Sequence, residues 1–208
     1  MEYLNLLLFV SIAVPLGLMS IICKDRTRSL LVFFICGLGV GLFCGELNAI
    51  IQKLLPYSYR FFVTNITPVV EEVFKALPIL FYAFEFRPKR QELLENSIAV
   101  GVGFAVLENA YVFASNIGSI SVVTAIMRGF GAGLMHAITT LMIGFGMSFV
   151  HIRRKIFYSG TTALLAAAVI YHSLYNNLVC TNHILEGFLI TTLVVAVGYY
   201  GLKKNKFL

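Results

Sequence analysis

Two adjacent carboxylates and an ammonium group lie near the start of an apolar stretch, at Glu71, Glu72 and Lys75. On a helix, Lys75 would be four residues from Glu71 and three from Glu72, so its side chain could pair with either one. In a soluble protein this spacing is typical of an exposed helix start. Here the apolar sequence continues past Pro78, and a charge inside a membrane is costly unless it is paired, ligated or hydrated. We therefore expect the three residues to belong to a functional site.

Three later apolar segments each contribute one more ionisable side chain, namely Glu108, His136 and His172. Taken singly, each histidine is explained equally well by a hydrogen bond to a neighbouring helix. At about 1.5 Å rise per residue, all three and the two adjacent glutamates lie roughly 6–12 Å from the same end of their segments. Unrelated structural residues have no reason to share a depth, so the spacing predicts one polar layer.

One chemistry that fits this layer is metal-assisted hydrolysis. Glu108, His136 and His172 would hold a divalent ion such as zinc, with Glu72 as a further candidate ligand, and the ion would keep one position for water. Glu71 or Glu72 would then accept the proton of that water.

A second chemistry needs no metal. One glutamate of the pair activates water directly, while His172 and Asn176, one helical turn apart on one face, stabilise the oxyanion. In either case Lys75 serves as the counter-ion of one carboxylate. Both mechanisms, and either glutamate as the base, fit the residues. Each predicts hydrolysis of an amide in a wet pocket within the bilayer.

The elements that must position these residues are apolar. Hydrophobic residues make up 59% of the 208-residue chain and charged residues 12%, against about 25% charged in a typical soluble domain. The net charge of +6 is spread over short basic clusters between apolar runs, which argues against a nucleic-acid partner. The four cysteines lack the spacing of metal ligands, so we interpret them as small buried residues and not as a disulfide framework. Zinc is the one candidate cofactor.

A membrane-spanning helix needs about 20 mostly apolar residues, and seven segments meet this length. We expect an all-α polytopic membrane protein that forms a single domain over 1–208, with its catalytic core at about 67–177. The seven predicted spans are 3–22, 29–51, 67–86, 96–116, 121–150, 156–179 and 184–202.

The distribution of lysine and arginine predicts the orientation of these spans. Twelve of the 16 lie in the odd-numbered connectors and the C-terminal tail, and two lie in the even-numbered connectors. Because cytoplasmic loops are enriched in basic residues, we expect the N-terminus outside and the C-terminus in the cytoplasm. The polar layer would then lie nearer the outer surface.

Two glycine patterns predict where helices pack. Small residues four positions apart let helix backbones approach closely in lipid. We expect packing faces at Gly37, Gly41 and Gly45, and at Gly129, Gly133 and Ala137.

The segment before the paired glutamates carries start signals for a helix. Thr67 is a candidate N-cap with Pro68 at the first helical position. This start would place Glu71 and Glu72 in the first two turns, where the helix dipole favours carboxylates. The preceding connector, about 52–66, is expected to be an interfacial segment or a cover over the site.

Four motifs in this order resemble the PrsW family of bacterial intramembrane proteases. They are Glu71-Glu72-x-x-Lys75, Phe104-x-x-x-Glu108-Asn109, His136-x-x-x-Thr140 and His172-x-x-x-Asn176. The resemblance implies a multi-pass protein of the bacterial plasma membrane. It also implies that this protein makes the first, extracytoplasmic (site-1) cut in a membrane-spanning anti-sigma factor, which releases a sigma factor under envelope stress. The family is described both as glutamic-type and as metal-dependent, so both mechanisms stay open.

Related families provide the alternatives. Type II CAAX prenyl endopeptidases and bacteriocin-immunity proteins are similar in these motifs, but their first motif usually ends in arginine with one more residue of spacing. Their second motif usually ends in histidine, so Lys75 and Glu108 favour the PrsW branch. A proton-coupled transporter also uses buried Glu and His, but the inverted repeats typical of transporters are not visible in the sequence.

Overall fold

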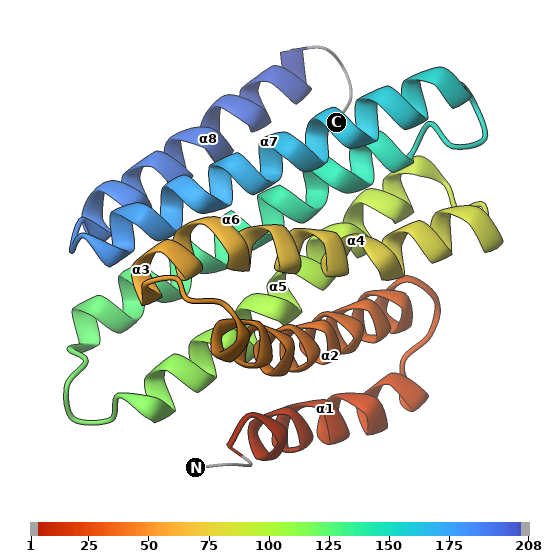
Figure 1. The fold of residues 1–208 in the computed structure, drawn as a ribbon. Helices are drawn as coiled ribbons and strands as arrows, with labels where there is room; N and C mark the ends of the chain where they lie inside the picture. The colour runs from red at the N-terminus through yellow and green to blue at the C-terminus, as the bar shows by residue number, and fades with distance from the viewer. Residues whose placement is uncertain (1–3, 205–208) are drawn as a thin grey trace.

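Helices follow one another along residues 4–204, the part of the chain that the computed structural model describes (Figure 1). No strand occurs between these residues, so the predicted all-α class is confirmed. Tyr3, with which the first predicted span begins, and Lys206 of the basic tail lie outside the described residues. The elements are α1 (Leu4–Ile22), α2 (Asp25–Leu54), α3 (Tyr59–Phe61), the π-helix η1 (Phe62–Ile66), α4 (Thr67–Glu85), α5 (Arg90–Ser115), α6 (Val122–Met147), α7 (Arg154–Cys180) and α8 (Ile184–Lys204).

Five of these helices are long and apolar enough to cross a membrane, namely α1, α2, α5, α6 and α7. The apolar part of α8 is shorter, Ile184–Val197. Helix α4 has 19 residues, but the two glutamates and the lysine of the first motif lie within it. The polytopic helical architecture is therefore supported, while the total of seven spans and the orientation of the termini stay predictions.

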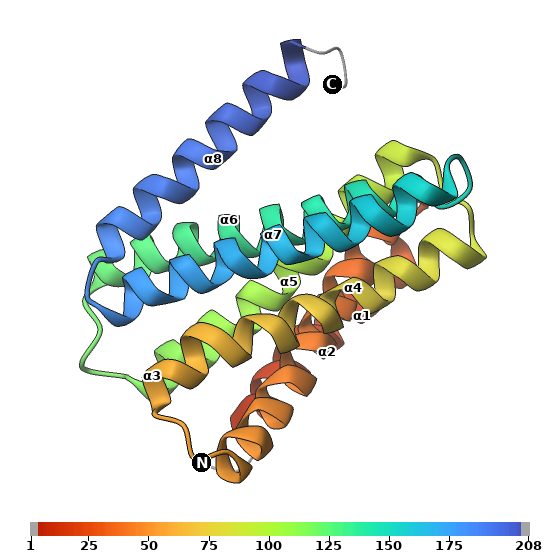
Figure 2. The ribbon, with the colours of Figure 1, turned by 45° about the horizontal axis from the view of Figure 1, so that its top comes forward.

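The long helices α2, α5, α6 and α7 pack side by side in this order and form the centre of the structure (Figures 1 and 2). Helix α4 contacts α2, α5, α6 and α7. Helix α1 lies against α2, and α8 lies against α6 and diverges from the rest in Figure 2. Buried side chains of α2, α4, α5, α6 and α7, among them Phe33, Ile79, Val100 and Ile143, form an apolar core beside the polar residues of α4.

Glycines bring α2, α5 and α6 into backbone contact. A Cβ atom at Gly37 would lie 2.1 Å from the Val100 carbonyl oxygen, and one at Gly101 would lie 2.3 Å from the His136 carbonyl oxygen. Atoms cannot approach that closely, so only glycine permits these contacts. The predicted packing face of α2 is confirmed at Gly37, where the helices touch, and at Gly41, which is in van der Waals contact with α5.

The second predicted face, at Gly129, Gly133 and Ala137, is wrong at the two glycines, whereas Ala137 is buried against Gly101 of α5. A Cβ atom at Gly129 or Gly133 would have no described heavy atom within 4 Å. Gly131 lies in the contact instead, where a Cβ atom would be 2.8 Å from the Tyr175 hydroxyl. The i, i+4 spacing identifies a stripe of small residues, but another face of α6 is turned toward its neighbours.

The connector before α4 is helical over most of its length. Its helix begins at Tyr59, where the Ser58 hydroxyl accepts from the backbone N–H of Phe61 at 3.3 Å, and it continues through η1 into α4. The predicted N-cap at Thr67 is therefore wrong, because residue 66 before it is already helical. Glu71 lies more than two turns beyond the true start, so the helix dipole does not explain its position.

The close approach at Gly37 gives a stability test. We expect Gly37→Ala to lower the free energy of unfolding by about 1–3 kcal/mol, because the methyl group overlaps a backbone carbonyl that cannot move alone. Gly129→Ala is the matched control and should be neutral or stabilising by up to about 1 kcal/mol, since it has open space and a better helix propensity. Thermal unfolding in detergent measures both, and equal midpoints would contradict the packing assignment.

Candidate functional site

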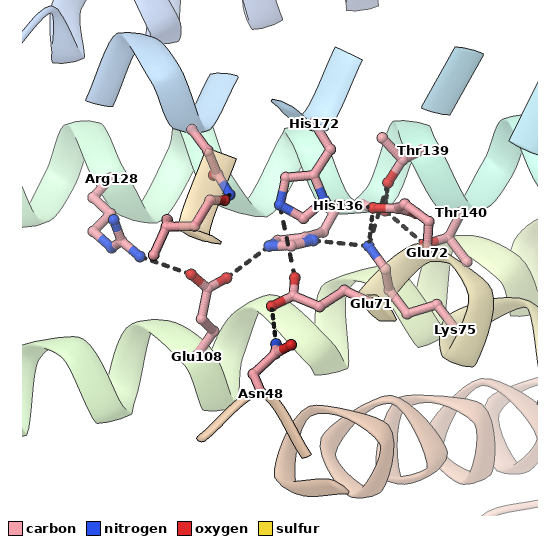
Figure 3. A network of polar contacts seen from close by, with 12 residues as sticks. Asn48, Glu71, Glu72, Lys75, Glu108, Arg128, His136, Thr139, Thr140 and His172 are labelled. Carbon is pink, nitrogen blue, oxygen red and sulfur yellow. Dashed lines mark hydrogen bonds and ion pairs between the residues drawn. The ribbon is translucent and has the colours of Figure 1, made fainter. Parts of the chain in front are cut away.

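Lys75 is completely buried and lies at the centre of a polar network (Figure 3). Its Nζ donates to Glu72 Oε1 at 2.6 Å, to His136 Nδ1 at 2.9 Å and to Thr139 Oγ1 at 3.5 Å. The Phe104 ring centroid lies 4.9 Å from the ammonium. A buried cation persists only when it is paired and its donors are satisfied. Here acceptors from α4 and α6 satisfy it together.

His136 is held between Lys75 and Glu108 (Figure 3). An ammonium has donors only, so His136 Nδ1 accepts from Lys75 and Nε2 carries the ring proton. This Nε2–H donates to Glu108 Oε2 at 2.7 Å, and Arg128 donates to Glu108 Oε1 at 2.8 Å. Glu108 has no cation within a turn on α5, and α6 supplies both of its partners.

His172 of α7 faces both adjacent glutamates. Its Nδ1–H donates to Glu72 Oε1 at 2.7 Å, so Nε2 carries the lone pair. Nε2 faces Glu71 Oε2 at 3.7 Å, which is too long for a direct hydrogen bond. Glu71 Oε2 is buried and has no hydrogen-bond partner among the described residues. Two acceptors therefore face each other across a gap that a water molecule or a cation would bridge.

The two adjacent glutamates have different surroundings. Glu71 lines a cavity of about 260 Å³, and its Oε1 accepts from Asn48 of α2 at 3.5 Å. Glu72 is completely buried, and its Oε1 serves both Lys75 and His172. One carboxylate of the pair is thus reached from a cavity, and the other is part of the packed network.

The structure places Glu71, His136 and His172 together as a candidate metal site, since one ligand atom of each lies within 4.8 Å of the others. A Glu-His-His donor set is typical of catalytic zinc, and the unpartnered Glu71 Oε2 fits a cation. His136 would bind an ion only after one ring nitrogen leaves its present partner. The predicted ligand set contains Glu108 instead of Glu71. In the structure Glu108 lies behind His136, the usual place of a carboxylate that orients a metal-bound histidine.

Asn176 makes a different contact from the predicted one. Its Nδ2 donates to the Val63 carbonyl oxygen of η1 at 3.1 Å. That carbonyl lacks a backbone donor because the N–H of Thr67 bonds to Phe62 and Pro68 has no N–H. Asn176 therefore satisfies a carbonyl that the proline leaves free. Its role as an oxyanion donor stays a prediction.

The site resembles that of a hydrolase, because it combines buried carboxylates with a gap between two hydrogen-bond acceptors. A comparison with protein families identifies the class of enzyme. A family model described as PrsW family intramembrane metalloprotease matches residues 25–202. The chain belongs to the PrsW family. No curated protein and no solved structure matches it. As a PrsW-family member it is a peptidase, and with its apolar helices it is a multi-pass membrane protein, consistent with a bacterial plasma membrane.

Sequence reasoning did not assign three residues to this PrsW-family site. Arg128 neutralises Glu108, Asn48 donates to Glu71, and Thr139 accepts from Lys75. Arg128 and Asn48 could have been found from the sequence, since each is a polar residue inside an apolar segment, like the residues that were predicted for the site. Thr139 carries no such signal, because threonine hydroxyls commonly bond to their own helix.

The buried Lys75 gives a second stability test. Lys75→Met should lower the free energy of unfolding by about 3–5 kcal/mol, because it leaves Glu72 buried without its cation. Adding Glu72→Gln should recover much of this loss. Arg26→Met is the control: Arg26 pairs with Glu95, but its side chain is 66% exposed, so the change should stay below about 1 kcal/mol. Similar unfolding midpoints for Lys75→Met and Arg26→Met would contradict this reading of the network.

Proposed function

We propose that this PrsW-family peptidase hydrolyses a peptide bond of a single-span membrane protein, with Glu71 acting on the attacking water. The observation that carries the proposal is the 3.7 Å gap between Glu71 Oε2 and the His172 Nε2 lone pair. Both atoms accept hydrogen bonds, so a water that lies beside this gap, within hydrogen-bond distance of both atoms, can donate to each. The cavity that Glu71 lines offers that water a way in.

Glu72 and Lys75 act as positioning residues in this proposal. Glu72 Oε1 accepts from His172 Nδ1 and so keeps the lone pair of that ring on the side of Glu71. Lys75 balances the charge of Glu72 and fixes the His136 ring from the other side. Each of the two adjacent glutamates has one oxygen, Oε2, without a hydrogen-bond partner among the described residues, but only Glu71 also lines the cavity, which supports it as the proton acceptor.

A zinc ion fits the same residues. Glu71, His136 and His172 would hold it, and when bound it supplies a Lewis acid that activates water and polarises the peptide carbonyl. Glu72 then orients His172, and Glu108 orients His136. In the tautomer that the contact with Glu72 requires, His172 Nε2 is an acceptor on the side of Glu71, which supports a role for His172 as a ligand or water acceptor over one as an oxyanion donor.

The proposed substrate is a membrane-spanning anti-sigma factor, which the enzyme would cut first and on the extracytoplasmic side. Family membership supports this class of substrate, and the distribution of basic residues supports a site nearer the outer surface. The cut would begin the release of a sigma factor under envelope stress.

Substitutions at the adjacent glutamates test the assignment of the base. Glu71→Gln, Glu72→Gln and His172→Ala should each reduce cleavage of a co-expressed, epitope-tagged single-span anti-sigma factor by roughly 10²–10⁴-fold. Glu71→Gln should leave the unfolding midpoint nearly unchanged, whereas Glu72→Gln should lower it, since only Glu72 loses an ion pair. Glu85→Gln at the exposed end of α4 is the control. Full cleavage by all three site variants would refute the proposal.

Metal content separates the two mechanisms. If zinc takes part, elemental analysis of purified protein should find about one ion per chain, and Glu71→Gln and His172→Ala should each lose it. Glu108→Gln should still bind zinc, with affinity weaker by about 10–100-fold, because it only supports a ligand. No zinc in the parent, together with cleavage that resists chelators, would leave Glu71 as a metal-free base.

A further inference from the structure

Glu46 is a charge in α2 that the proposed mechanism does not use. It lies eight residues before the end of the helix at Leu54 and its side chain is exposed. No ion pair or hydrogen bond of the described residues includes it. A charged residue in an apolar helix marks a functional position when it has no partner of its own. Its neighbours in space therefore indicate what it binds.

Glu46 lines the same cavity as Glu71. Gly41, Gly45 and Ala49 form the α2 wall beside it, and Phe104 and Leu107 are among the residues of the α5 wall. The cavity thus combines apolar side chains with a polar lining that has carboxylates at more than one point. Glu71, whose side chain is nine-tenths buried, also belongs to this lining, and its Oε2 has no hydrogen-bond partner among the described residues.

The cavity exists because α2 and α5 separate along the glycine stripe. At Gly37 an added Cβ atom would overlap the α5 backbone at 2.1 Å. A Cβ atom at Gly41 would lie 3.5 Å from the nearest atoms of α5, and one at Gly45 would have no atom of α5 within 4 Å, only Asn5 Nδ2 of α1 at 3.3 Å. Successive turns of α2 therefore open a wedge, with Glu46 at its wide end.

The charges of the wedge favour a cation. Glu108 is neutralised by Arg128, whereas Glu46 has no cation near it among the described residues. A lysine or arginine side chain matches both features, since its methylene stem packs on apolar walls and its charged end bonds to a carboxylate. Such a side chain would bring the adjoining peptide backbone toward Glu71.

We infer that the wedge between α2 and α5 binds a basic side chain of the substrate near the scissile bond, and that Glu46 binds its charged end. The inference rests on the proposed peptidase function and adds a substrate class to it: polypeptides with lysine or arginine beside the cleavage site. Glu46 is a specificity-determining residue in this scheme, and Glu71 remains the group that acts on water.

Binding of two matched peptides tests this inference without requiring cleavage. The probes are a fluorescent, capped heptapeptide of alanine and leucine with a central lysine, and its uncharged counterpart with norleucine. Fluorescence anisotropy measures their Kd for the full chain in nanodiscs of zwitterionic lipid, which does not attract the lysine by charge. The parent should bind the lysine peptide about tenfold more tightly than the norleucine peptide, as expected for a hydrogen bond to a charged group.

Three variants of the chain identify the group responsible. Glu46→Gln should bring the ratio of the two Kd values to about one, with unchanged affinity for the norleucine peptide. Glu46→Lys should reverse the preference toward a peptide with central glutamate. Glu186→Gln on α8, also an exposed glutamate but outside the cavity, should keep the parent ratio. Glu46 is exposed, and thermal unfolding checks that each variant folds.

The outcomes for the inference and for the proposed function are distinguishable. Equal binding of both peptides by the parent, or a lysine preference that persists in Glu46→Gln, overturns the inference. If the preference depends on Glu46 but Glu71→Gln cleaves normally, the binding site stands and the proposed catalytic role of Glu71 fails. If cleavage depends on Glu71 but no preference depends on Glu46, the proposed catalytic role of Glu71 stands and the inferred binding site for a basic side chain fails.

Discussion

The buried ion pair between Lys75 and Glu72 is the interaction on which the rest of the site depends. Both side chains are fully removed from solvent, and two charges in that position are costly unless additional hydrogen bonds stabilise them. Lys75 donates such a bond to His136 on α6, and Glu72 Oε1 accepts one from His172 on α7. The pair therefore joins three helices and sets the two rings in opposite tautomers. His136 Nε2–H donates to Glu108, and the lone pair of His172 Nε2 faces Glu71 without a hydrogen bond.

A proline imposes the second constraint. Pro68 cannot donate to the preceding turn, and its ring would clash with the carbonyl four residues earlier in a regular α-helix. The chain widens into the π-helix η1 just before it, and π-helical turns are frequent at functional sites. The carbonyl of Val63 that is left free accepts from Asn176, one turn beyond His172 on α7. The irregular entry to α4 thus also fixes α7, which carries His172.

The sequence alone was sufficient to predict most of the helices and the members of the polar layer, because charged residues in apolar segments are few and costly. It was insufficient for relations that depend on which face of each helix is turned inward. Spacing allowed Lys75 to reach either adjacent glutamate, and it could not show that α6 supplies both partners of Glu108. The same limit explains the error at Gly129, which lies on an unpacked face of α6. The N-cap error at Thr67 has another cause, since a local start signal occurred within a longer helix.

The need for two adjacent glutamates follows from helix geometry. Consecutive residues on an α-helix point about 100° apart, so neighbouring carboxylates have largely different surroundings, although His172 lies near both of these. Glu72 points into the packed network with Lys75, and Glu71 points toward α2, where Asn48 and the cavity lie. A hydrolase within a membrane must keep its charges satisfied and still leave one acceptor free for water. In the proposed mechanism Glu72 takes the first task and Glu71 the second, and Glu71 lines the cavity that opens where α2 separates from α5 beyond Gly37.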